Sequence, residues 1–353
     1  MKTNSLLIIV IIIIVAIGSI RLLNKTNYEK NMAAEEDSVS PIIDLTYLTD
    51  DNKRVLNGKV ILVKGEAFEV GNTAKATDNV DGDISNKIAI DGNVDTDNVG
   101  EYTVKYSVED NNHNRAELEQ TFEVREEQKN GLPVLMYHFF YSKDDPNYAG
   151  KTPDNNLLMV EKFSEQMQYL VDDNYYYPSW QEVIDYVDGK SKLPEKSVVL
   201  TDDDGNHTFF ALAVPVLEEK KIPMTSFVIT SDNGDRLSEK YEYVNYQSHS
   251  EKMHAAGGNG KGAMVNWSYD QILQDLQTSK NKIETVTGGK CNVFCYPFGH
   301  YNDVAIKALS DANFDLAFTV EGGRVKLGAN KLKLPRVRIN GNTTISQFKE
   351  AVK

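Results

Sequence analysis

The hydrophobic pattern of this 353-residue chain changes at Gly131. From Pro41 to Glu126, short segments alternate apolar with polar residues, as half-buried antiparallel strands do, and Asp, Asn and Gly separate them as turns. From Gly131 onward, short apolar runs typical of buried parallel strands alternate with segments of helical period. The sequence therefore predicts two domains of different class: a small all-β sandwich over residues 41–126 and an α/β domain over residues 131–353.

The α/β domain carries several helix signals between its apolar runs. Phe163, Met167 and Leu170 fall on one face of a predicted helix, and Ser179 and Ser268 each begin a capping-box pattern that opens another. At about 220 residues, this alternation fits one (β/α) barrel, which we expect to be distorted. Residues at strand ends matter in such a barrel, because the carboxyl ends of the strands face the active site.

An uncharged apolar segment lies near the N-terminus. Residues 3–20 carry no charge, and residues 6–17 are wholly aliphatic. The longer stretch is a marginal membrane span, while the shorter one also suits the core of a signal peptide. We expect residues 1–23 to form an uncleaved membrane anchor, followed by a flexible polar linker over residues 24–40.

Composition argues against two classes of protein. The chain has 38 Lys and Arg but 52 Asp and Glu, which gives a net charge of −14. A nucleic-acid partner is therefore not expected. A disulfide framework is not expected either, because Cys291 and Cys295 are the only cysteines. Four extended steps would separate their Cα atoms by about 13 Å, beyond the reach of a disulfide, so we expect two buried free thiols.

The segment of residues 41–126 resembles the bacterial immunoglobulin-like modules of surface proteins. The similarity is carried by ATDNVDGDI and by VDTDNVGEYTVKYSVEDNNHNRAE, and it implies a spacer or docking unit without chemistry of its own. One acidic turn, Asp91-Gly-Asn93-Val-Asp95, begins like a calcium loop. Because Thr96 replaces the required Gly and no Glu closes the loop, we interpret it as a solvated turn.

Three consecutive carboxylates, Asp202, Asp203 and Asp204, directly follow one apolar run of the α/β domain. Adjacent like charges disfavour one another unless they share a cation or a proton. A divalent metal would relieve that repulsion and leave a neighbouring carboxylate free as a base. The alternative is a solvated loop in which one Asp caps the next helix.

Two further groups of polar residues follow other apolar runs. His249 and His254, together with a carboxylate, would make a His, His, Asp set suited to zinc with positions left open, although two surface histidines in a polar loop are the alternative. Pro297 and Gly299 end a predicted strand and can expose backbone amides that stabilise an oxyanion. By itself, this last group is only a strand-to-helix loop.

Together, these groups resemble the polysaccharide deacetylases of the NodB-homology type, the fourth family of carbohydrate esterases. The histidine pair has the longer spacing used by deacetylases of exported poly-N-acetylglucosamine, and the similarity covers residues 131–353. The matching segments are Thr201–Gly205 (TDDDG for TFDDG), His249–Ser250 with His254, Pro297–Gly299 (Pro-Phe-Gly for Pro-Tyr-Gly), Pro133–His138 and Leu334–Ile339.

This resemblance implies roles for particular residues. Asp204, His249 and His254 would hold a divalent metal, with Zn²⁺ as the expected ion. Asp203 would be the general base that deprotonates water, and the backbone amide of Phe298 would help to stabilise the oxyanion. Such a site suits amide hydrolysis, because a metal lowers the pKa of its bound water from about 15.7 toward 7.

The chain departs from the family pattern at three places. Asp202 replaces the usual aromatic residue; we expect it to point into solvent, although it could instead raise the pKa of Asp203 or bind a cation. Cys295 stands where many relatives place an Arg that pairs with the base, and Arg336, at a predicted strand end, is expected to supply that charge, a surface ion pair being its alternative role. The late histidine that acts as general acid in relatives is missing. His138 is the candidate general acid in its place, and the alternative is that His138 has only a structural role. Asp203, once protonated as the base, could also give its proton to the leaving amine.

The sequence therefore predicts a hydrolase of carbon–nitrogen bonds other than peptide bonds. It would remove N-acetyl groups from a cell-envelope polysaccharide, of the peptidoglycan or poly-N-acetylglucosamine type, and release acetate. We expect a single-pass membrane protein with its catalytic domain on the cell surface. Two alternatives remain: an O-acetyl esterase on the same metal site, and a non-catalytic glycan-binding or adhesion protein.

Overall fold

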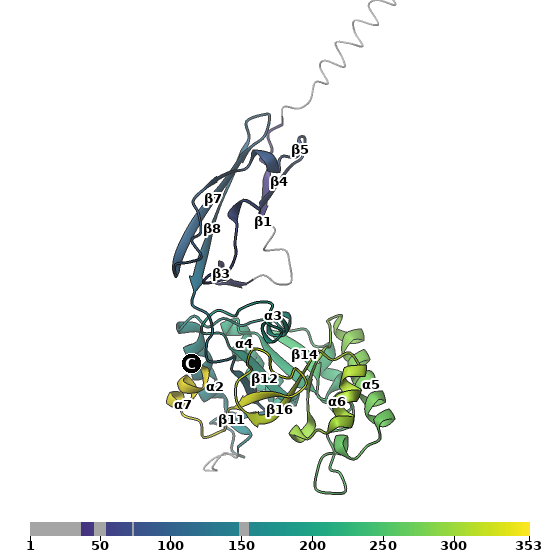
Figure 1. Cartoon of the computed structure of the whole chain (residues 1–353). Helices are drawn as coiled ribbons and strands as arrows, with labels where there is room; N and C mark the ends of the chain where they lie inside the picture. Colours follow the sequence, from purple (N-terminus) through teal and green to yellow (C-terminus); the bar gives the residue numbers. More distant parts are fainter. Residues whose placement is uncertain (1–36, 46–53, 73, 148–154) are drawn as a thin grey trace, which may run out of the picture. The chain divides into compact units, whose positions relative to one another are not determined.

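A computed structural model describes residues 37–45, 54–72, 74–147 and 155–353 (Figure 1). The predicted anchor, residues 1–23, and most of the predicted linker lie outside these ranges. Within them, no helix combines the length and the hydropathy needed to cross a bilayer. The chain divides into two compact units, the first drawn from residues 1–50, 69–94 and 102–121 and the second from residues 51–68, 95–101 and 122–353.

The strands before residue 126 form two sheets. The expected alternation is present on β7, where the side chains of Val104, Tyr106 and Val108 are buried while their neighbours are more exposed. It is absent from β3, where all residues from Val60 to Val63 are buried. A small core of Ala76, Ile84 and Val108 lies in the first unit. One sheet has the order β1 (Ile42–Leu45), β4 (Ala74–Asp78), β5 (Gly82–Asp83), and the other the order β2 (Val55–Leu56), β3 (Lys59–Val63), β8 (Arg115–Arg125), β7 (Gly100–Glu109), β6 (Ala89–Asp91).

Seven parallel strands form the centre of the second unit. Each strand pairs with its neighbour in the parallel direction, and β9 pairs with both β12 and β17, so that the ring closes. The α/β class expected from the alternating pattern is confirmed. The strands, in ring order, are β12 (Val199–Asp204), β13 (Met224–Val228), β14 (Val244–Ser248), β15 (Val293–Cys295), β16 (Leu316–Gly322), β17 (Leu334–Arg338) and β9 (Val134–Tyr137).

Helices surround this ring, with α5 and α6 side by side (Figure 1). The predicted capping boxes at Ser179 and Ser268 are both formed, and the side chains of Phe163, Met167 and Leu170 are buried on one face of α2. The α-helices are α2 (Val160–Asp172), α3 (Trp180–Val187), α4 (Val214–Lys220), α5 (Tyr269–Thr287), α6 (Asp303–Asp311) and α7 (Ile345–Val352). Short elements complete the unit: β10 (Phe139–Tyr141), β11 (Leu157–Met159), a π-helical turn η4 (Phe209–Ala213), and 3₁₀ turns that include η5 (Gly234–Ser238), η6 (Ala263–Val265) and η7 (Pro297–Gly299).

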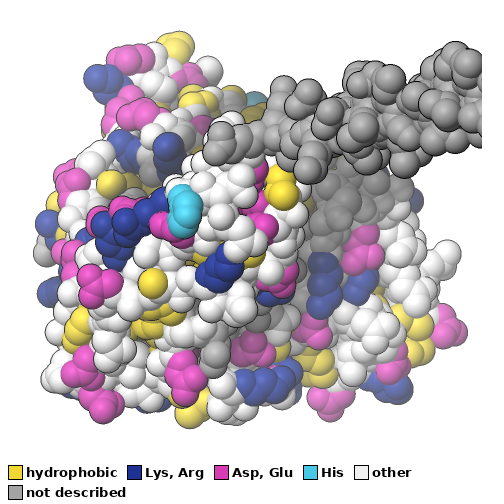
Figure 2. All heavy atoms as spheres, turned by 90° about the horizontal axis from the view of Figure 1, so that it is seen from above, with side chains coloured by type: hydrophobic (Ala, Val, Ile, Leu, Met, Phe, Trp, Pro, Cys, Tyr) yellow, Lys and Arg dark blue, Asp and Glu magenta, His cyan; other side chains and the backbone are white. Residues whose placement is uncertain are grey.

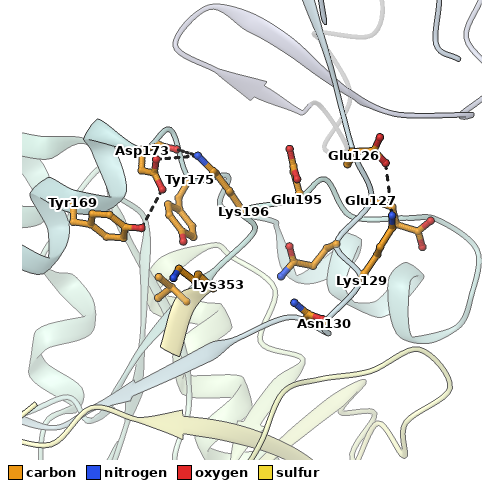
Figure 3. A pocket seen from close by; sticks show the side chains of 12 residues that line it. Glu126, Glu127, Lys129, Asn130, Tyr169, Asp173, Tyr175, Glu195, Lys196 and Lys353 are labelled. Carbon is orange, nitrogen blue, oxygen red and sulfur yellow. Dashed lines mark hydrogen bonds and ion pairs between the residues drawn. The ribbon is translucent and has the colours of Figure 1, made fainter. Parts of the chain in front are cut away.

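A pocket of about 380 Å³ lies at the amino-terminal end of the barrel (Figure 3). Its walls include residues 126–130, which precede β9, and Lys196, which precedes β12. Lys196 Nζ lies 2.9 Å from Asp173 Oδ1, and the Tyr169 hydroxyl donates to Asp173 Oδ2 at 3.1 Å. Because barrel enzymes react at the opposite end of their strands, this pocket is not the candidate active site.

Charged side chains of both signs are interspersed on the face drawn in Figure 2. Several dark-blue Lys and Arg side chains lie close to the cyan histidine, next to magenta carboxylates. The expectation that no nucleic acid binds stays a prediction, which rests on the net charge of −14.

The capping box of α5 offers a local test of the fold. Replacing Ser268 by Ala removes the side-chain oxygen that accepts from the Gln271 amide, and should cost about 1 kcal/mol. For a domain of this size, we expect the thermal midpoint to fall by roughly 2–4 °C, measured by circular dichroism. Thr278→Ala, at an exposed interior position of the same helix, is the matched control and should leave the midpoint within about 1 °C. Equal midpoints for both variants would contradict the role of the cap.

Candidate functional site

The residues singled out in the sequence gather at the carboxyl ends of the barrel strands. His138 directly follows β9, the three aspartates end β12, His249 directly follows β14, and Pro297 begins the turn after β15. Parallel strands place all of these ends on one side of the ring. The polar groups that are far apart in the sequence therefore share one site.

Asp204, His249 and His254 offer three ligand atoms within 4.8 Å of one another. Asp204 Oδ1 lies 3.5 Å from His249 Nε2 and 3.3 Å from His254 Nε2. The structure thus brings together the three residues expected to hold a metal.

The two imidazoles of this group are suited to metal binding. His249 Nδ1 lies 2.8 Å from the Cys295 carbonyl oxygen, which can only accept, so Nδ1 carries the hydrogen and Nε2 keeps a free lone pair. Burial lowers the pKa of His249, with the charges of Asp203 and Asp204 opposing it. Burial also lowers the pKa of His254. Both rings are therefore neutral at pH 7, which is the form that binds metals.

A divalent cation fits the electrostatics of this group. Asp204 Oδ1 is buried and accepts no hydrogen bond from any described residue, although two imidazole nitrogens lie near it. Burial raises the pKa of Asp204 above its ordinary value, and the nearby His249 opposes that rise. One carboxylate oxygen and two imidazole nitrogens match zinc and similar transition-metal ions better than calcium or magnesium.

Asp203 lies beside this group and is bound by Arg336 in a bidentate ion pair. Arg336 Nη1 donates to Asp203 Oδ1 and Nη2 to Oδ2, each at 2.7 Å. Burial alone would raise the pKa of the Asp203 carboxyl, but the charge and hydrogen bonds of Arg336 hold it well below its ordinary value. Asp203 is therefore ionised across the physiological range. The pKa of Asp203 is thus lowered rather than raised, and Asp202 is not among the main causes of the shift.

Arg336 lies inside the barrel, with 0% of its surface exposed. Its remaining donors bind Thr201 Oγ1 at 3.1 Å and the Thr319 carbonyl at 3.0 Å. Nη2 also lies 2.9 Å from the Sγ atom of Cys295, the residue that stands where many relatives have an Arg. The guanidinium of Arg336 is therefore next to that position. The alternative of a surface ion pair is wrong, because β17 directs this side chain inward.

The burial of Asp202 differs from what we expected. It is fully buried rather than exposed to solvent, because β12 lies between β9 and β13 and all six of its residues are buried. Ser226 donates to its Oδ2 at 3.1 Å, and Oδ1 has no partner among the residues described. Burial, together with the charges of Asp203 and Asp204, raises the pKa of Asp202 well above its ordinary value.

His138 and Phe298 border the site from two other strands. His138 Nε2 lies 3.7 Å from Asp203 Oδ2, near the base but beyond hydrogen-bonding distance. The Phe298 ring lies with its centroid 4.2 Å from that of His254 and is 43% exposed, so it covers one side of the histidine. The φ of Phe298 is +57°, a strained value typical of functional turns. The next residue must be Gly299, since a Cβ there would lie 2.3 Å from Val320 Cγ2.

Asp275 is a supporting residue that the motifs did not reveal. It lies on α5, and its two carboxylate oxygens accept from the amides of Glu251 and Lys252, each at 2.8 Å. These bonds hold the loop between His249 and His254. Burial raises the pKa of Asp275 to about 6. In the sequence, the only signal for Asp275 is that a charged residue falls on the predicted buried face of a helix.

Both cysteines are buried, and neither forms a disulfide, as expected. Cys295 Sγ lies 3.5 Å from Asp203 Oδ2, close to the ion pair described above. Burial raises the pKa of its thiol well above the ordinary value. The sulfur is therefore a neutral neighbour of the base.

Comparisons with known proteins agree with this geometry. Residues 190–317 match the family model described as polysaccharide deacetylase, and residues 56–124 match that of the bacterial surface protein Ig-like domain. The poly-beta-1,6-N-acetyl-D-glucosamine N-deacetylase of Staphylococcus epidermidis is 26% identical over 243 residues, covering 63% of this chain and 84% of that protein. Both resemblances seen in the sequence are confirmed.

Solved structures show the same fold. A deacetylase of Streptococcus pyogenes in complex with acetate has a TM-score of 0.56 and 23% identity, covering 63% of this chain and 98% of that one. A polysaccharide deacetylase of Bacillus cereus has a TM-score of 0.53 and 25% identity, with coverages of 73% and 79%. The architecture of the second unit therefore recurs in proteins of this type.

Metal binding by the Asp204 group can be measured directly. We expect the chelator-treated protein to bind about one equivalent of Zn²⁺ or Co²⁺, and Asp204→Asn to weaken that binding at least 100-fold, since it removes a ligand charge. Equilibrium dialysis with metal analysis gives both values. Asp232→Asn, an exposed neighbour outside the group, should bind as the wild type does. Unchanged binding by Asp204→Asn would refute the assignment.

The bidentate ion pair between Arg336 and Asp203 should set the pH at which activity is lost on the acid side. Arg336→Lys keeps a positive charge but loses the fork that binds both oxygens of Asp203. The pKa of Asp203 should then rise toward its ordinary value, so activity carried by the ionised carboxylate is lost at higher pH than in the wild type. The acid limb of kcat/KM for acetate release should move upward by about one pH unit.

The control for this change is Arg324→Lys, which alters an arginine that binds backbone carbonyls of α7 instead. That variant should keep the wild-type profile. An unchanged acid limb in metal-loaded Arg336→Lys would show that the ion pair does not set the protonation of the base.

Proposed function

Because the chain carries a polysaccharide deacetylase domain together with a bacterial surface Ig-like domain, we propose that it removes N-acetyl groups from an N-acetylglucosamine-containing polysaccharide of the cell envelope and releases acetate. The observation that carries this proposal is the convergence of Asp204, His249 and His254 beside an ionised Asp203. A cation site next to a free carboxylate is what hydrolysis of an unactivated amide requires. The N-deacetylases among its relatives support the same reaction.

The three ligands would hold a divalent metal, for which we propose zinc. Such an ion supplies Lewis acidity, polarising the acetyl carbonyl and lowering the pKa of water. Support for zinc comes from the donor set, one carboxylate and two neutral imidazoles.

Asp203 would accept the proton of the attacking water. Its two oxygens each bind Arg336, yet each keeps a further lone pair that can accept a proton. The low pKa of Asp203 keeps it ionised but makes it a weak base, so water of lowered pKa is the matching proton donor. Arg336 therefore sets both the position and the protonation state of the base.

The remaining steps fall to residues around the base. The backbone amide of Phe298, in the turn after β15, would donate to the oxyanion as the carbonyl carbon becomes tetrahedral. His138 would deliver a proton to the departing sugar amine, since its Nε2 lies 3.7 Å from Asp203 Oδ2 and its side chain is partly exposed. Asp203, once protonated, is the other group that can return that proton.

We also propose that the enzyme works at the cell surface, anchored by residues 1–23. The support is the uncharged apolar segment of residues 3–20, with a polar linker after it. A polysaccharide substrate of the envelope lies outside the cytoplasm. The Ig-like module would then act as a spacer or docking unit between anchor and catalytic domain.

The reaction is tested by acetate release from β-1,6-linked N-acetylglucosamine oligomers. Asp203→Asn preserves the shape of the side chain but removes the charge that accepts a proton, so kcat should fall about 10²–10⁴-fold. Asp173→Asn, at the opposite end of the barrel, should retain wild-type turnover. Zinc content and thermal midpoint of both variants separate lost chemistry from lost folding.

Other outcomes would overturn the proposal in specific ways. Acetate released only from O-acetylated glycans would make the protein an esterase. Glycan binding without any acetate release would make it an adhesion protein. Wild-type turnover in Asp203→Asn would remove Asp203 as the base.

A further inference from the structure

A second group of carboxylates lies in the first unit, away from the barrel. Asp37, Asp78 and Asp110 offer three oxygen atoms within 4.8 Å of one another. Asp37 precedes β1, Asp78 ends β4 and Asp110 directly follows β7. Three segments that are distant in the sequence therefore bring their negative charges to one point, at the end of the module where the β4–β5 and β7–β8 turns lie (Figure 1).

One oxygen of each carboxylate is already used by its own loop. Asp78 Oδ1 accepts from the amides of Val80 and Asp81 at 2.9 and 2.8 Å. Asp110 Oδ1 accepts from the amides of Asn112 and Asn114, both at 2.8 Å. These bonds hold the side chains in place whether or not a ligand is present.

The second oxygen of Asp78 is the unexplained feature. Asp78 is 9% exposed, and its Oδ2 is buried without a hydrogen-bond partner among the described residues. A buried charged oxygen without a partner is unfavourable, because it has lost its hydration and gained no hydrogen bond in return. Neither Asp78 nor its two companions forms an ion pair with a described Lys or Arg within 4 Å. Lys87 binds the side chain of Asn111 at 2.7 Å, and its charge acts on Asp110 without a direct ion pair, so the described residues balance this group only in part.

We propose that Asp37, Asp78 and Asp110 form a calcium site of the Ig-like module. Calcium takes six to eight oxygen ligands at about 2.3–2.6 Å, so two ligands on opposite sides of the ion lie about 4.6–5.2 Å apart. The three carboxylate oxygens lie within 4.8 Å of one another, which is compatible with such a sphere. The set holds only oxygen, which favours calcium over zinc, and water can complete the coordination.

This site differs from the acidic turn that begins like a calcium loop. Asp91 lies on β6 with its side chain exposed, and Asp95 uses its oxygens for the amides of its own turn. Neither belongs to the group of three carboxylates. The structure thus assigns the ion to residues that no local pattern connects.

A bound ion would join the segment at Asp37 to the turns after β4 and β7. Asn114 already links two of these segments, since its Nδ2 donates to the Asp37 carbonyl at 2.9 Å and to Asp110 Oδ2 at 2.8 Å. Calcium would add charge neutralisation to this link. The expected effect is a module whose stability depends on millimolar calcium, in the range of extracellular calcium modules, about 10⁻⁴–10⁻³ M.

The test is a calcium titration of the purified full-length chain, freed of metal by a chelator. Isothermal titration calorimetry with CaCl₂ should give one site with a dissociation constant of roughly 10⁻⁴–10⁻³ M. At 10 mM CaCl₂, the thermal midpoint of the module should rise by about 5 °C or more. No heat of binding and no shift in the wild type would overturn the proposal.

Two variants of the Ig-like module test which carboxylates bind the calcium ion. Asp78→Asn keeps the oxygen that accepts from Val80 and Asp81 but removes the charge, so binding should weaken at least tenfold and the calcium-dependent shift should fall to about half or less of the wild-type shift. Asp91→Asn is the matched control in the same module and should bind as the wild type does. If Asp91→Asn abolishes binding and Asp78→Asn does not, the ion belongs to the acidic turn instead.

A third variant separates this site from the proposed catalytic group. Asp204→Asn should lose zinc but bind calcium with wild-type affinity. A loss of calcium binding in Asp204→Asn, with normal binding in Asp78→Asn, would place the ion in the barrel and refute the proposal. Failure of the deacetylase function alone would leave the calcium results unchanged.

Discussion

The buried ion pair between Arg336 and Asp203 organises the reactive end of the barrel. Removing two charges from water costs several kcal/mol per ion unless geometry and further hydrogen bonds compensate. Here, Arg336 extends from β17 to Asp203 on β12 and also binds the Thr319 carbonyl on β16. Those strands meet around the interior only because the ring closes through β9. The ion pair therefore links β12, β16 and β17 inside the closed sheet.

Three consecutive aspartates have different surroundings, which raise the pKa of Asp202 and of Asp204 but lower that of Asp203. Asp202 is fully buried, Asp203 is kept ionised by Arg336, and Asp204 Oδ1 lies 3.5 and 3.3 Å from the Nε2 atoms of His249 and His254. Neighbouring groups whose pKa values are moved apart in this way can take separate roles in one reaction. The repulsion expected between adjacent carboxylates is thus resolved without exposing any of them fully to solvent.

The two groups for which we propose cation binding differ in the chemistry of their donors. The group in the barrel combines one carboxylate with two imidazoles, a set suited to a transition metal with open positions. The group in the Ig-like module contains only carboxylates, which suit a hard ion in a structural role. One supports the proposed hydrolysis, and the other bears on the stability of the module alone.

The sequence by itself determined what depends on neighbours along the chain. The change of hydrophobic period at Gly131, the capping boxes at Ser179 and Ser268, and the residue types able to bind a metal are all local signals, and the structure contains each of them. Propensity and periodicity act over a few residues, so they can be recognised without knowing the fold.

Only the tertiary structure decided burial and pairing between distant residues. Asp202 was expected in solvent, yet β12 lies between two strands and buries it. Asp275 on α5 holds the histidine loop, and Asp37, Asp78 and Asp110 meet from three segments. The free energy of a buried charge depends on which groups surround it in space, and that arrangement is set by strand order and ring closure rather than by local sequence.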